Sequence, residues 1–105
     1  MAGVLARLSR KPFAVVGHRG AAGRFPENTL KAVEYAIASG ADVVEVDVRA
    51  TRDGRLVAFH DPDLKRLFNR SERVRDLDYA WIRSNLLLGG EPIPLLEEVL
   101  EAVKG

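Results

Sequence analysis

The sequence has no cysteine among its 105 residues. Disulfide bonds, thiolate metal sites and cysteine nucleophiles are therefore excluded. Excess charge is also lacking, because 16 basic residues stand against 15 acidic ones and the formal net charge is +1. This balance does not indicate a partner such as nucleic acid or an anionic membrane surface.

Long apolar runs are missing as well. No segment approaches the roughly 18 apolar residues that a membrane helix needs. The first ten residues contain Val4, Leu5 and Leu8 among arginines, without an apolar run of signal-peptide length or a small-residue cleavage site. We therefore expect a cytoplasmic protein without a transmembrane segment. We also expect residues 1–12 to be a lead-in to one domain over residues 13–105.

The residues that are present suffice for a modest core. Hydrophobic residues make up 47% of the chain, so disorder is not the expected state. Twelve of the 16 basic residues are arginine. This excess is compatible with phosphate recognition, but equally with a warm habitat or GC-rich coding.

Strands and helices alternate along the sequence. Residues 13–17 predict a buried strand, and residues 28–40 predict a helix with Asn28 as N-cap and Gly40 as its end. A second strand is expected at 41–50 and a third at 56–59, joined as a hairpin by Arg52-Asp53-Gly54. Further along we expect a loop or ragged helix at 63–75, a weak helix at 76–84, a connector at 89–94 and a helix from 95. This order predicts an α/β fold with a mainly parallel sheet and helices outside it.

Residues that could perform chemistry occur where the predicted strands run into loops. In parallel α/β sheets and barrels this carboxyl edge is where ligands bind. The only two histidines of the sequence are among these residues. The three clusters are His18-Arg19-Gly20, Glu45-x-Asp47 and His60-Asp61.

Glu45 and Asp47 lie two residues apart in a predicted strand, so their side chains share one face while Val44, Val46 and Val48 take the other. Two neighbouring carboxylates repel each other, and a divalent cation relieves that repulsion. Hard oxygen ligands suit Mg²⁺ or Ca²⁺. The alternatives are that the acidic face lies in water, or that Arg49 neutralises part of its charge.

His18 and His60 fit an acid–base pair, because histidine titrates near neutral pH. Structural roles at the strand ends are the alternative. Arg19 offers forked donors that match a phosphate, or it pairs with Glu27 or Asp61. Asp61 either orients His60 or caps the turn before Pro62.

Taken together, these motifs resemble the N-terminal half of the glycerophosphodiester phosphodiesterase family. They occur in one order: His18-Arg19-Gly20, Pro26-Glu27-Asn28-Thr29, Gly40-Ala41-Asp42, Glu45-x-Asp47-Val48, Thr51-x-Asp53-Gly54, His60-Asp61 and Ile93-Pro94-x-Leu96-Glu97-Glu98. The resemblance covers roughly residues 13–103. It implies a partial TIM-type (β/α) barrel, namely its N-terminal half with a β-hairpin insertion.

The resemblance also implies an activity, which is metal-dependent hydrolysis of glycerophosphodiesters to glycerol 3-phosphate and an alcohol. On the matching positions, His18 and His60 would be the catalytic acid and base, and Arg19 would hold the phosphate. Glu45 and Asp47 would bind Mg²⁺ or Ca²⁺, with Glu27 beside the metal. The substrate's glycerol hydroxyl would attack the phosphorus and give a cyclic phosphate that water opens.

The family's third carboxylate ligand comes from a strand that would follow residue 105. We therefore expect the barrel to be completed by a second copy or a second chain, unless the chain is a fragment of a longer protein. An inactive half-barrel remnant that binds metal or phosphate, or only assembles, is the alternative. Lysophospholipase D and sphingomyelinase D-like activities share the histidine pair and the acidic strand, so the motifs do not separate them.

Overall fold

The computed structural model describes residues 2–7, 16–18, 26–41 and 43–104. These residues form six strands and five helices, one of them a short 3₁₀ helix named η1. In chain order they are β1 (Ala2–Arg7), β2 (Val16–His18), α1 (Leu30–Ala38), β3 (Val43–Ala50), β4 (Leu56–Ala58), α2 (Lys65–Phe68), η1 (Val74–Asp76), α3 (Tyr79–Asn85), β5 (Leu87–Leu88), β6 (Glu91–Pro92) and α4 (Leu96–Lys104). The predicted order of strands and helices is present from β2 to α4, except that the short strands β5 and β6 were not predicted at the expected connector.

The long strand β3 is the centre of a four-stranded sheet. It pairs with β2 in parallel and with β1 and β4 in antiparallel orientation. Glu45 is opposite both Leu5 of β1 and His18 of β2. Val48 is opposite both Ala2 of β1 and Ala58 of β4. Because a strand residue has one partner on each side, β2 and β4 share one edge of β3 and β1 covers the other.

The prediction of a mainly parallel sheet is wrong for this part of the chain. Only the β2–β3 pairing is parallel, and the sheet is mixed. Strand β1 was not predicted, and it lies within the segment expected to be a lead-in. An exposed edge of β3 would leave a row of unpaired backbone groups, and pairing with β1 satisfies them.

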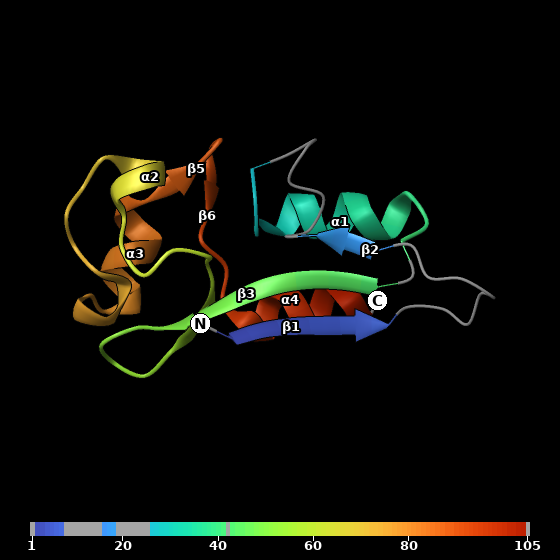
Figure 1. Ribbon diagram of the computed structural model, residues 1–105, viewed down its shortest axis with the longest axis horizontal. Coiled ribbons are helices and arrows are strands. Elements are labelled where there is room, and N and C mark those ends of the chain that lie inside the picture. The colour runs from blue at the N-terminus through green and yellow to red at the C-terminus, as the bar shows by residue number, and fades with distance from the viewer. Residues whose placement is uncertain (1, 8–15, 19–25, 42, 105) are drawn as a thin grey trace.

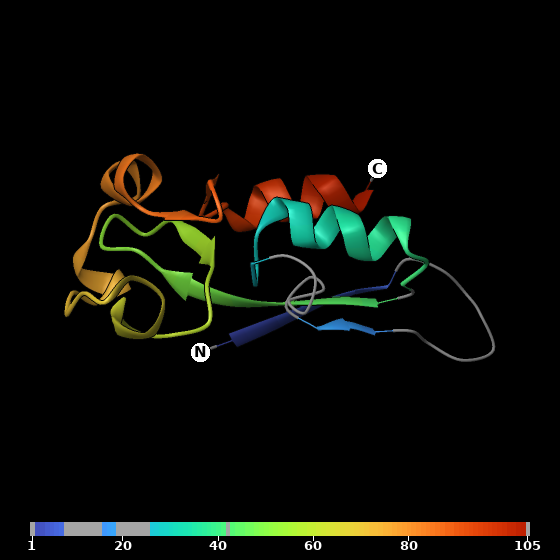
Figure 2. The same ribbon diagram turned by 90° about the horizontal axis from the view of Figure 1, so that it is seen from above.

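Helices α1 and α4 lie side by side on one face of this sheet (Figure 2). Val44 and Val46 pack into the core beneath them, which confirms that these valines face the helices. Val33 of α1 and Val99 of α4 supply the facing apolar side chains, and both are buried. Burial of this apolar stripe is what holds the two helices on the sheet.

Helix α1 starts one residue later than predicted. Its N-cap is Thr29, whose hydroxyl accepts a hydrogen bond from the Ala32 N–H at 3.3 Å. Asn28 has a φ of 59° and bonds elsewhere. Gly40, with a φ of 87°, follows the C-cap residue Ser39, so the predicted C-terminal stop is confirmed.

The segment between β3 and α4 forms a second lobe with its own core (Figure 1). The predicted β3–β4 hairpin is confirmed, and its turn also anchors α3. Asp53 accepts a hydrogen bond from the Tyr79 N–H at 3.1 Å, and Arg52 pairs with Asp78 at 2.8 Å. The hairpin insertion is therefore fixed to the lobe by its turn.

The four strands of the sheet form an open layer, and the described residues do not close a barrel. No helix within the described ranges combines the length and the apolar character needed to cross a bilayer.

Candidate functional site

The two carboxylates of β3 lie on the sheet face opposite the helices. Val44 and Val46 belong to the helix-facing core, and side chains alternate along a strand. Glu45 is half-buried and Asp47 is only 6% exposed. The structure thus brings the predicted acidic pair to one face, with the second carboxylate almost removed from water.

Asn28 holds Asp47 in place. Its Nδ2 donates to Asp47 Oδ2 at 3.4 Å, and its Oδ1 accepts from the Asp47 backbone N–H at 3.2 Å. The left-handed backbone of Asn28 turns its side chain towards β3, and the residue is 2% exposed. The local sequence pattern predicts Asn28 as a helix cap and does not indicate this contact with Asp47. The available signal was that asparagine is among the few residues that tolerate positive φ.

The two histidine segments flank this acidic pair along one edge of β3. The parallel register places His18 opposite Glu45. Further along the same edge, the Phe59 N–H donates to the Asp47 carbonyl at 3.0 Å, and His60 follows directly. Arg19 lies outside the described residues. The backbone therefore places His18 beside Glu45, and His60 one residue beyond the position beside Asp47.

His60 belongs to a chain of charged contacts. Its Nδ1 lies 2.7 Å from Asp61 Oδ1. Arg66 donates from Nε to Asp61 Oδ2 at 2.9 Å and from both terminal nitrogens to the two Glu27 oxygens at 2.9 and 2.8 Å. The Arg66 guanidinium holds the pKa of Asp61 below its usual range, and the contact with His60 adds a smaller effect in the same direction. The same carboxylates raise the pKa of Arg66.

Arg66 was absent from the predicted site. It lies 39 residues from Glu27 in sequence, and no local pattern could show that contact. Glu27, predicted as a metal neighbour, is the ion-pair partner of Arg66 in this structure.

Arg49 shares the strand with the acidic pair, but its donors go to the turn after β4. Nε and Nη2 both donate to the His60 carbonyl, at 3.1 and 2.9 Å. Arg49 fixes the backbone of His60 relative to β3.

Glu45 and Asp47 supply hard carboxylate oxygens, which is the donor chemistry that Mg²⁺ and Ca²⁺ prefer. Among the side chains that the structure describes, no three histidine, aspartate or glutamate residues gather around one point as metal ligands. The pair therefore fits a divalent cation as a partial ligand set. Further oxygens would have to come from outside the described side chains or from water.

Comparison with known proteins gives a consistent result. The profile of the glycerophosphoryl diester phosphodiesterase family matches residues 18–105. A glycerophosphodiester phosphodiesterase of Bacillus altitudinis is 44% identical over 96 residues, covering 85% of this chain and 39% of that protein. The chain thus spans about two fifths of the length of that relative.

Solved structures agree with the sequence matches. The glycerophosphodiester phosphodiesterase of Thermotoga maritima aligns with a TM-score of 0.76 and 41% identity, over 89% of this chain and 40% of its own. An Oleispira antarctica phosphodiesterase was solved with the product sn-glycerol 3-phosphate. It aligns with a TM-score of 0.80 and 32% identity, over 88% of this chain and 40% of its own. The predicted family is thereby confirmed: this chain belongs to the glycerophosphoryl diester phosphodiesterase family.

Proposed function

We propose that this chain supplies the catalytic residues of a cytoplasmic, metal-dependent phosphodiesterase. The reaction is hydrolysis of glycerophosphodiesters to glycerol 3-phosphate and an alcohol. The observation that carries the proposal is the register along one edge of β3, with His18 beside Glu45 and His60 just beyond the Asp47 contact. The product-bound relative from Oleispira antarctica supports the choice of substrate.

Glu45 and Asp47 are the proposed ligands of a divalent cation, Mg²⁺ or Ca²⁺, with Glu27 as a further ligand or neighbour. When bound, such a cation would neutralise negative charge on the phosphate as the transition state forms. The low exposure of Asp47 favours this role, because a nearly buried carboxylate interacts strongly with a neighbouring cation. The hydrogen bond from Asn28 orients the carboxylate.

His60 is the proposed general base. Arg66 favours the ionised form of Asp61, so the Asp61 carboxylate accepts the hydrogen of His60 Nδ1. In the neutral imidazole, Nε2 then carries the lone pair. Nε2 would take the proton from the attacking glycerol hydroxyl, and Asp61 acts as a positioning residue.

His18 is the proposed general acid, and Arg19 is the proposed phosphate-binding residue. As the glycerol oxygen bonds to phosphorus, the bond to the alcohol oxygen breaks and His18 gives that oxygen a proton. Water then opens the cyclic phosphate to glycerol 3-phosphate, with the two histidines exchanging roles.

Turnover is proposed to need a completed barrel, from another copy, a second chain or further sequence. The alternative is a half-barrel without turnover that binds metal or phosphate, or assembles. The observation that favours this alternative is that the sheet is open, because its four strands do not close a barrel within the described residues.

Release of glycerol 3-phosphate from glycerophosphocholine, with Mg²⁺ or Ca²⁺ present, tests the proposal. We expect turnover that His18→Ala and His60→Ala each reduce by about 10²-fold or more, as loss of a general acid or base does. The Glu34→Gln variant, which changes an exposed charge on α1, should keep the wild-type rate. Calorimetric metal binding without turnover in any oligomeric state would favour the non-catalytic half-barrel.

A further inference from the structure

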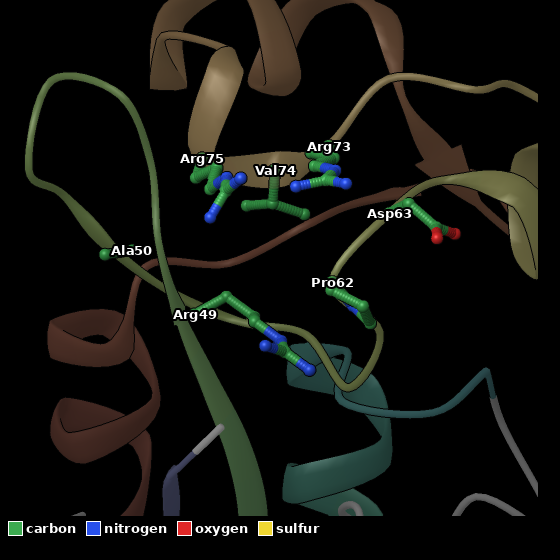
Figure 3. Close-up of a pocket in the computed structure, with 7 residues that line it drawn as sticks. All are labelled: Arg49, Ala50, Pro62, Asp63, Arg73, Val74 and Arg75. Carbon is green, nitrogen blue, oxygen red and sulfur yellow. The ribbon is translucent and has the colours of Figure 1, made fainter.

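A pocket lies between the C-terminal end of β3 and the segment that includes η1 (Figure 3). Its volume is about 510 Å³. Figure 3 shows Arg49 on one side of this space, with Arg73 and Arg75 on the other side, next to Val74. The remaining lining residues are Ala50, Pro62 and Asp63.

The wall that carries Arg73 and Arg75 is held by backbone contacts. The Val74 N–H donates to the Pro62 carbonyl at 3.0 Å, and the Leu64 N–H donates to the Glu72 carbonyl at 3.0 Å. The Val74 side chain is 2% exposed and belongs to the core of the second lobe. The two arginines on either side of Val74 are therefore carried by a fixed segment.

The charge of the pocket is not balanced by its own residues. Of the arginines whose side chains the structure describes, five each form an ion pair with a carboxylate: Arg52, Arg55, Arg66, Arg70 and Arg83. The other three are Arg49, Arg73 and Arg75, and all three line this pocket. Asp63 is the one acidic residue among its lining residues, and its Oδ1 accepts the Lys65 N–H at 3.0 Å.

Within the described part of the chain, neither Arg73 nor Arg75 forms an ion pair, and Arg49 donates to a carbonyl. Three guanidinium groups around one space are a donor set that fits a phosphate group, because each guanidinium presents a planar fork of N–H groups. A neutral ligand would leave that positive charge uncompensated.

The pocket is joined to the proposed active site through Arg49, which lines it and holds the His60 carbonyl. We propose that Arg49, Arg73 and Arg75 bind a second phosphate group of the substrate, carried on the alcohol that leaves. This inference rests on the proposed function. The glycerol part of such a diester is uncharged, so the second anionic group belongs to the alcohol.

Calorimetric titration of the chain in EDTA tests the pocket, with three probes: inorganic phosphate, glycerophosphoinositol and glycerophosphoinositol 4-phosphate. We expect the wild-type chain to bind the 4-phosphate about tenfold more tightly than the unphosphorylated diester. Arg73→Gln with Arg75→Gln should weaken binding of phosphate and of the 4-phosphate by about tenfold or more. Both arginines are exposed, so the double variant should keep the circular dichroism spectrum of the wild type.

The matched control is Arg52→Gln with Arg70→Gln, which removes the same net charge from two exposed ion pairs outside the pocket. It should leave the affinities unchanged. Equally weakened phosphate binding in both double variants, or no weakening in either, would overturn the proposal that this pocket binds phosphate. Phosphate binding without any preference for the 4-phosphate would overturn the proposed substrate class.

Turnover is measured separately on the same preparations. Arginine-dependent binding of phosphate and of the 4-phosphate, together with no turnover in any oligomeric state, would favour the non-catalytic half-barrel and leave the pocket supported.

Discussion

Asn28 links the loop before α1 to the acidic strand, and it does so from a backbone conformation that few residues adopt. Its φ is 59°, and its amide makes two contacts with Asp47. Loss of this side chain would leave the buried Asp47 N–H without its partner, and an unmet buried group costs free energy.

Asn28→Ala is expected to lower the free energy of unfolding by about 2–4 kcal/mol, from the lost contacts and from the left-handed backbone. Asn69→Ala is the matched control, because Asn69 also has a positive φ, 54°, but is exposed. It should cost about 1 kcal/mol, which isolates the backbone contribution. Urea denaturation of both variants measures the difference. Equal costs would mean that the contacts with Asp47 contribute nothing.

Arg66 keeps Asp61 ionised, and this contact has a pH signature. A carboxyl whose pKa is lowered on folding stabilises the protein above its unfolded pKa, about 3.9 for aspartate. The stabilisation is lost as pH falls through the lowered folded pKa.

Arg66→Gln is therefore expected to raise the Asp61 pKa towards its usual value and to reduce the loss of stability on acidification below about pH 4. Carboxyl ¹³C NMR of Asp61 follows the titration directly. Arg70→Gln removes an exposed pair with Glu72 and should leave the Asp61 titration unchanged. An unaltered Asp61 curve in Arg66→Gln would show that Arg66 does not set this pKa.

At the scale of elements, the local patterns predicted most of the fold. The period-two pattern of β3, the Asp53-Gly54 turn and the stop at Gly40 are all present in the structure. These features depend on residues close together in sequence. The pairing of β1 with β3 joins residues about 40 positions apart, and no local pattern in Ala2–Arg7 could show it.

The same reasoning explains the candidate site. The alternation along β3 was enough to predict that Glu45 and Asp47 share a face. The contacts of Arg66 with Glu27 and of Asn28 with Asp47 depend on how loops pack, and the sequence alone did not indicate them.

Strand β1 covers an edge of β3 that would otherwise expose unpaired backbone groups. In an antiparallel pair, the N–H groups of successive residues point alternately towards and away from the partner strand. Of two adjacent positions in the middle of β1, Val4 and Leu5, one N–H therefore points towards β3.

Proline at whichever of these two positions has its N–H pointing towards β3 should lower the free energy of unfolding by about 2–3 kcal/mol. It should also increase self-association, because the β3 edge becomes available to other copies. Proline at the neighbouring position is the matched control and should be better tolerated. Sedimentation velocity and thermal unfolding of Val4→Pro and Leu5→Pro measure both effects. If neither proline changes mass or stability, the β1–β3 pairing does not protect the edge.

At the scale of the whole molecule, the chain corresponds to about two fifths of the length of the Bacillus altitudinis and Thermotoga maritima proteins. Its described strands form an open mixed sheet. Figure 2 shows α1 and α4 on one face of the sheet. Glu45 and Asp47 alternate with the helix-facing Val44 and Val46, so they lie on the opposite face. In the family's TIM-type barrel the helices lie outside, so the opposite face of each strand lines the interior. The orientation of the acidic pair is thus compatible with a site at the mouth of a completed barrel.

The central claim is that Glu45 and Asp47 together hold a divalent cation. Calorimetric titration of this chain with Ca²⁺ and Mg²⁺ tests it directly, in the wild type and in Glu45→Gln, Asp47→Asn and the exposed control Glu34→Gln. We predict that each β3 variant weakens cation binding by about tenfold or more, while Glu34→Gln leaves it unchanged. Cation binding that is absent in the wild type, or equally strong in all four proteins, would contradict the account.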